Sequence, residues 1–129
     1  MSLATPVVSA EEIFAINRNV RWVGLVTDEG EVLLNQMRPG VQSHSPHEVD
    51  EELLKLGPLT LLGVEERYDS YLRGVREIVV YYGVTVSIYA RLGPQIIAIS
   101  IEEGREDALA DVSAWLRNKK SEPTKTSQQ

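Results

Sequence analysis

The sequence predicts an α+β domain in which helices cover an antiparallel β-sheet. Three short runs rich in Val, Ile and Tyr follow one another between residues 76 and 101 with almost no connecting sequence, which is typical of an antiparallel meander. A turn signal at residues 28–30 separates two further strand-like runs, and helical patterns precede, divide and follow the strands. At 129 residues, the chain has the length of one domain with its own core.

The first part of the chain predicts a short helix followed by a β-hairpin. Ser9 and Glu12 have the spacing of a capping box, in which each side chain binds the backbone N–H of the other residue. Val20 to Thr27 is apolar on both faces, as in a strand near the middle of a sheet. Gly30 can adopt the positive φ of a tight turn, so Glu31 to Met37 is predicted to be the returning strand.

The middle segment, from about Pro46 to Leu72, has a helical pattern that is interrupted at Gly57-Pro58. Proline removes one helical hydrogen bond and crowds the carbonyl group of Leu54, so we expect a kink or two helical pieces. The residues expected to be buried are Val49, Leu53 and Leu56 in the first piece and Leu61, Val64 or Leu62, Tyr68, Tyr71 and Leu72 in the second.

The end of the chain predicts three strands and an amphipathic helix. The strands are expected at Ile78 to Tyr82, Val84 to Ala90 and Ile96 to Ile101. In the helix after Gly104, apolar residues recur at helical spacing; they are Ala108, Leu109, Val112, Trp115 and Leu116. We expect a single domain over residues 1–118 and a disordered tail over residues 119–129, since the tail has no large apolar residue.

Composition disfavours several classes of function. The chain has 13 basic and 19 acidic residues and a net charge of −6, which argues against nucleic acid as the main partner. It has no cysteine, so it has neither a disulfide framework nor a thiolate metal site, and a cytoplasmic location is expected. No window approaches the roughly 18 apolar residues that a membrane span needs.

The order helix, two strands, long helix, three strands, helix resembles the roadblock and longin branch of the profilin-like folds. The stretch V-G-L-V-x-x-x-G, here Val23 to Gly30, is also similar to one in a group of small archaeal proteins. The resemblance implies a five-stranded antiparallel sheet in the order 2-1-5-4-3, with the first and last helices on one face and the middle helix on the other. It further implies a homodimer that pairs through the third strands, with a small GTPase or a scaffold complex as partner.

The third strand offers independent support for self-association. As an edge strand it would carry no Lys, Pro or inward charge of the kind that normally prevents edge pairing. Either a second copy pairs with this edge, which we favour, or a loop, the second half of the middle helix or the tail covers it. The candidate interface residues are Ile78, Val79, Val80, Tyr81 and Tyr82.

Two further groups of residues have competing interpretations. The charged cluster of Glu65, Glu66, Asp69 and Arg73 contains paired carboxylates, but its helical spacing favours an exposed, ion-paired face that could meet a partner. In the alternative function, a small-molecule sensor would hold a ligand between the sheet and the middle helix, in a pocket lined by Tyr68, Tyr71 and Tyr89.

No signature of an enzyme or of a metal site is present. His44 and His47 precede Glu48 and other acids, as in some zinc or nickel sites, but no firm third ligand follows and a solvated loop before an acidic helix start explains them. Phosphate-binding loops, nucleophile elbows and H-E-x-x-H motifs are absent. We therefore expect a non-enzymatic homodimeric module, without a cofactor or metal, that acts as a scaffold or as a regulator of a small GTPase.

Overall fold

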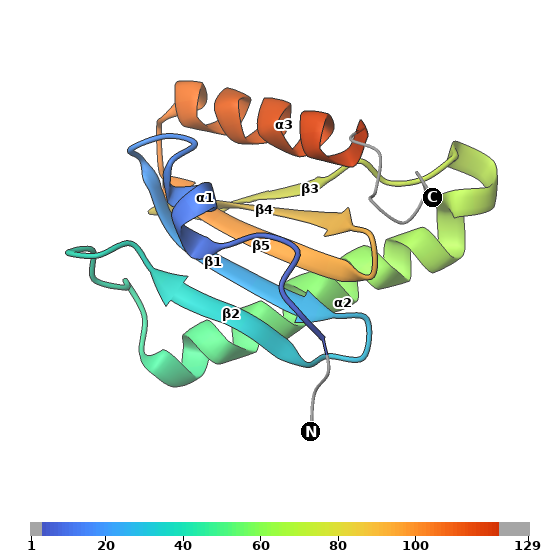
Figure 1. The fold of residues 1–129 in the computed structure, drawn as a ribbon, viewed down its shortest axis with the longest axis horizontal. Coiled ribbons are helices and arrows are strands. Elements are labelled where there is room, and N and C mark those ends of the chain that lie inside the picture. Colours follow the sequence, from blue (N-terminus) through green and yellow to red (C-terminus); the bar gives the residue numbers. More distant parts are fainter. Residues whose placement is uncertain (1–3, 122–129) are drawn as a thin grey trace.

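The computed structural model describes residues 4–121 and confirms the predicted α+β layout (Figure 1). Its elements are α1 (Ala10–Phe14), β1 (Val20–Thr27), β2 (Val32–Met37), α2 (His47–Leu72), β3 (Ile78–Tyr81), β4 (Thr85–Leu92), β5 (Gln95–Glu102) and α3 (Glu106–Ser121). The strands form one sheet in the order β2-β1-β5-β4-β3, and all neighbours are antiparallel. Helices α1 and α3 lie on one face of the sheet and α2 lies on the other (Figure 1).

The main core lies between the sheet and the pair α1 and α3. Alternate residues of the three central strands point into it, because successive side chains of a strand point to opposite faces. From α1 and α3 it takes Ala10, Ile13, Ala108, Val112 and Leu116, and from the strands it takes Val20, Val23, Leu25, Val86, Ile88, Ala90, Leu92, Ile97, Ile99 and Ile101. The amphipathic pattern of the last helix is thus confirmed.

The capping box and the hairpin are also as predicted. The Ser9 hydroxyl accepts a hydrogen bond from the Glu12 backbone N–H at 3.1 Å, and the Glu12 carboxylate accepts one from the Ser9 N–H at 3.4 Å. Gly30 has φ +90°, and β1 pairs with β2 on either side of this turn. Residues 9–37 are therefore held in place by local hydrogen bonds and by the hairpin.

Helix α2 differs from the prediction, since it runs unbroken through Gly57-Pro58 from His47 to Leu72. Leu54, Pro58 and Leu61 are buried against the sheet at helical spacing, and this packing outweighs the hydrogen bond that proline removes. Gly57 lies against the ring of Tyr89, where an added Cβ would be 1.9 Å from Cε1. Gly57 therefore allows the helix to approach the Tyr89 ring closely, and it does not break the helix.

The buried face of α2 was predicted only in part: Leu61 is buried, and Leu53, Leu62 and Val64 are partly buried. Of the residues expected in the core, Val49, Leu56, Tyr68, Tyr71 and Leu72 are exposed. The helix carries apolar residues on more than one side, so its sequence alone does not reveal which side meets the sheet. An exposed apolar surface consequently remains on α2, to which Leu59 also contributes.

Helix α3 continues to Ser121, whereas the tail was expected to start at Lys119. The rest of the expected tail, residues 122–129, lies outside the described residues. Among the helices within residues 4–121, none combines the length and the apolar character needed to cross a bilayer.

Candidate functional site

Strand β3 forms one edge of the sheet and pairs only with β4 within the described residues. The Tyr82 N–H donates to the Thr85 carbonyl at 2.9 Å where the two strands meet. Hydrogen-bonded pairs alternate along an antiparallel ladder, so the backbone N–H and C=O groups of Val80 and Ile78 also point toward β4. The N–H and C=O groups of Val79 and Tyr81 therefore point away from the sheet, toward an edge that no strand within residues 4–121 covers.

The side chains of the predicted interface divide into two groups. Ile78 packs against the α2 side of the sheet, Val79 packs against the main core, and Val80 is partly buried. Tyr81 is 71% exposed, and Tyr82 is exposed as well. The aliphatic residues thus hold the strand in place, and the two tyrosines are the side chains available to a second molecule.

One member of the predicted partner face, Glu65, is engaged inside the molecule. Its carboxylate, 18% exposed, accepts hydrogen bonds from Arg91 Nη2 at 2.9 Å and Nε at 3.1 Å. Arg91 also donates to Asp28 at 2.7 Å, and the Glu65 hydrogen bond is the main cause that raises the pKa of Arg91. This network ties α2 to β4 and to the β1–β2 turn, so Glu65 faces the sheet and not a partner.

The other three residues of that face lie on the surface at the end of α2. Glu66 and Asp69 are exposed, and Arg73 caps the helix in the left-handed conformation, with φ 63° and ψ 44°. The Arg73 backbone N–H donates to the Asp69 carbonyl at 2.8 Å. These three charged side chains are therefore accessible, as are the neighbouring Tyr71 and Leu72, and their role as a partner face stays a prediction.

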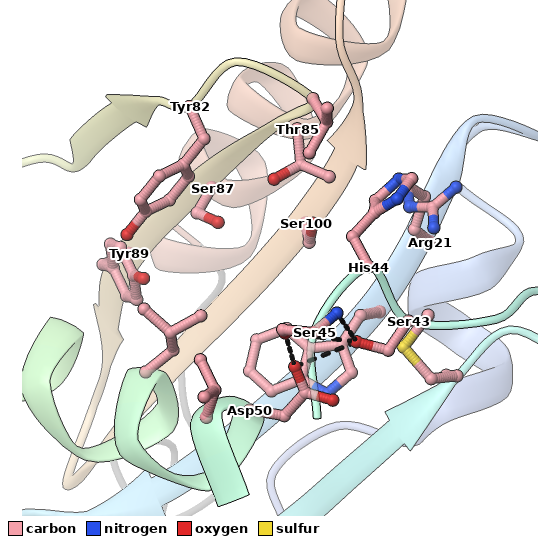
Figure 2. Close-up of a pocket in the computed structure, with 15 residues that line it drawn as sticks. Arg21, Ser43, His44, Ser45, Asp50, Tyr82, Thr85, Ser87, Tyr89 and Ser100 are labelled. Carbon is pink, nitrogen blue, oxygen red and sulfur yellow. Dashed lines mark hydrogen bonds between the residues drawn. The ribbon is translucent and has the colours of Figure 1, made fainter. Parts of the chain in front are cut away.

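A cavity of about 370 Å³ lies between the sheet, the first turns of α2 and the loop that precedes α2 (Figure 2). Of the three tyrosines predicted to line a pocket, only Tyr89 does so. Tyr68 and Tyr71 are exposed near the other end of α2. The sequence therefore indicated the right two layers but the wrong end of the helix.

Tyr89 stays in its neutral form under ordinary conditions. Burial raises its pKa to about 12, and the neighbouring Tyr82 adds to the shift. The phenol of Tyr89 therefore keeps its proton and can donate a hydrogen bond. Figure 2 shows Tyr82 and Tyr89 on one side of the cavity, across from Arg21 and His44.

The two histidines of the candidate metal site point to different surroundings. His47 Nε2 lies 2.8 Å from the Glu51 carboxylate one helical turn along α2, whereas His44 lines the cavity. Within residues 4–121, no group of three or more His, Cys, Asp or Glu side chains is placed to hold a metal ion. The structure thus brings together no ligand set around this pair.

Known proteins resemble the chain in structure and not in sequence. No protein-family model matches it, and no curated protein matches it. The gliding protein MglB from Thermus thermophilus is 14% identical with a TM-score of 0.68, and an MglB in a tetrameric arrangement is 13% identical with a TM-score of 0.65; each match covers 94% of this chain and 93% of the other.

A Roadblock/LC7 domain from Streptomyces avermitilis is similar as well. It is 16% identical with a TM-score of 0.56, over 81% of this chain and 87% of that domain. Together with the sheet order and the placement of the helices, these matches define the fold as roadblock/longin-like. The fold implied by the resemblance is thereby confirmed.

Proposed function

We propose that this chain is a non-enzymatic module that pairs with a second copy through β3 and acts as a scaffold or regulator of a small GTPase. The observation that carries the proposal is the open β3 edge, with the outward N–H and C=O groups of Val79 and Tyr81 and the exposed Tyr81 ring. An open, uncharged edge is a template for strand pairing.

The other edge of the sheet is less suited to such pairing. Strand β2 exposes Asn35 and Gln36, and its ladder with β1 is irregular between Leu25 and Val26, where a shift in register interrupts a flat pairing surface. Pairing through β3 would join two sheets into one and cover Tyr81. An MglB of similar fold occurs in a tetrameric arrangement, which supports self-association on this scaffold.

The proposed contact with a GTPase uses the exposed side of α2. This surface combines the charged residues Glu66, Asp69 and Arg73 with the exposed Leu56 and Leu59. Mixed apolar and charged surfaces suit regulated contacts between proteins. The pair of Glu65 and Glu66 could suggest catalysis, but Glu65 is held by Arg91 inside the molecule, so Glu66 and Asp69 are the carboxylates left for contact with a partner.

Two experiments test the proposal in sequence. Light scattering over a range of concentrations should give twice the mass of one 14.4 kDa chain. Purified small GTPases from the same organism, loaded with GDP or with a nonhydrolysable GTP analogue, should then bind the dimer in a nucleotide-dependent way. Reversal of charge at Glu66 and Asp69 should weaken GTPase binding without changing the mass of the dimer. If the variant binds the GTPase as tightly as the parent chain, the contact does not lie on α2.

A further inference from the structure

The floor of the cavity is lined by hydroxyl groups from two neighbouring strands. Thr85 and Ser87 of β4 and Ser100 of β5 line the cavity, and Ser87 lies directly opposite Ser100 in the ladder. On the other face of the same strands, Val86, Ile88, Ile99 and Ile101 form the main core. The hydroxyls are therefore confined to the face that the start of α2 overhangs.

Part of this hydrogen-bonding capacity is unused. The hydroxyls of Thr85 and Ser100 and the imidazole of His44 make no hydrogen bond with another residue of the described chain, and all three face the cavity (Figure 2). Thr85 and Ser100 are half-buried and His44 is exposed, so water hydrates these groups in the free chain and a ligand can replace that water. The groups are spread around a space large enough for a small molecule.

The walls of the cavity are suited to a flat apolar ring. Trp22, Tyr82 and Tyr89 provide aromatic surfaces, and Val49 and Leu53 of α2 approach from the opposite layer. Aromatic side chains pack favourably with rings in offset or edge-to-face geometry. A cavity with mainly apolar walls and a few convergent polar groups has the usual character of a small-molecule site.

Two charged side chains line the cavity, and each is held by other residues of the chain. Arg21 binds the Glu102 carboxylate at 2.7 Å and the Gln42 carbonyl at 2.8 Å. The Asp50 carboxylate accepts hydrogen bonds from the hydroxyls of Ser43 and Ser45 at 2.9 and 2.5 Å. Arg21 is therefore engaged by Glu102, and the negative charge that Asp50 keeps repels an anion. The cavity consequently favours an uncharged ligand over an anionic one.

We propose that this cavity binds a small, uncharged, planar ring compound that carries hydroxyl or amide groups at its edge. The ring packs between the tyrosines and α2, and its polar edge meets the hydroxyls of Thr85, Ser87 and Ser100. This site shares Tyr82 with the predicted interface, but it lies on the α2 face of the sheet and does not use the outward groups of Val79 and Tyr81 that carry the proposed dimer.

The test uses 2-naphthol as the probe, with naphthalene-2-sulfonate as an anionic compound of the same ring. Trp22 lines the cavity, whereas Trp115 packs against the core on the other face of the sheet. The two indole N–H signals in a ¹H–¹⁵N spectrum therefore report on the site and on an internal control. Addition of 2-naphthol should shift the Trp22 signal with saturation and leave the Trp115 signal unchanged.

Variants separate the site from a nonspecific effect. Ser100→Ala should weaken 2-naphthol binding by about 3- to 10-fold, the loss of one hydrogen bond, and Ser100→Leu should abolish it by filling the cavity. Ser70→Ala, on the exposed surface of α2, should leave binding unchanged. The absence of a saturable Trp22 shift, or tighter binding of the sulfonate than of 2-naphthol, would overturn the proposal, and neither result would affect the dimer.

Discussion

The substitution Tyr81→Lys provides a sharp test of the β3 interface. Tyr81 is 71% exposed and its backbone N–H points away from β4, so the change does not touch the core of the monomer. We expect the folded chain to lose no more than about 1 kcal/mol of stability, the range of strand propensities at exposed positions. Val79 is less informative, because it packs against the main core.

The effect on the dimer should be much larger. A tyrosine side chain offers roughly 150–250 Å², so covering its exposed 71% would bury roughly 110–180 Å² and stabilise each chain by about 3–4 kcal/mol. If half of that surface is covered, the two chains together lose about 3–4 kcal/mol. Repulsion between two ammonium groups about 8 Å apart adds about 0.5–2 kcal/mol. The dissociation constant should therefore rise by at least about 100-fold.

Sedimentation equilibrium over a range of concentrations measures this change directly. The control is Val32→Lys, an exposed position on the opposite edge strand β2, which should leave the dissociation constant unchanged. Urea unfolding confirms that both variants remain folded. If Tyr81→Lys dimerises as tightly as the parent chain, or if Val32→Lys alone disrupts the dimer, the interface does not lie at β3.

Three further predictions concern the packing of α2 and its surroundings. Gly57→Ala should cost about 1–3 kcal/mol in urea unfolding because its Cβ would overlap the buried Tyr89 ring, whereas Gly63→Ala, with open space around it, should stabilise the chain by about 0.5–1 kcal/mol. Tyr89 has its pKa raised from 10.0 to about 12, so its contribution is complete below pH 10 and is lost as the pH rises through 12; urea stability should fall less steeply over this interval in Tyr89→Phe. Arg91→Met leaves a partly buried carboxylate without its partner and should cost about 1–3 kcal/mol, against less than about 0.5 kcal/mol for the exposed Arg67→Met, both measured by urea unfolding.

The strands and the last helix could be predicted because their signals are local. Runs of β-branched residues separated by Gly30 and Gly93 specify strands and turns, and the spacing of Ala108, Val112 and Leu116 specifies one buried helix face. Each of these patterns repeats along a single element. It can therefore be recognised without knowing which distant residues the element contacts.

The path and the orientation of α2 could not be predicted, because they depend on contacts with distant residues. Pro58 signals a break in isolation, and only its burial beside Leu54 and Leu61 keeps the helix continuous. The cavity was predicted between the right layers and with Tyr89 in its lining, but at the wrong end of α2, for the same reason. The hydroxyl groups of its floor lie together because the register between β4 and β5 sets Ser87 opposite Ser100. No local pattern in the sequence predicts that register.

The central claim, that two copies join edge to edge through β3, is tested most directly by a distance between the copies. The chain has no cysteine, so Tyr81→Cys and Val32→Cys each provide one site for a spin label, and pulsed dipolar spectroscopy measures the separation between two labelled chains. With strands about 4.8 Å apart in two joined five-stranded sheets, the Tyr81 labels should lie within roughly 20 Å and the Val32 labels roughly 40 Å apart. A shorter distance between the Val32 labels than between the Tyr81 labels, or no coupling between chains at either site, would contradict it.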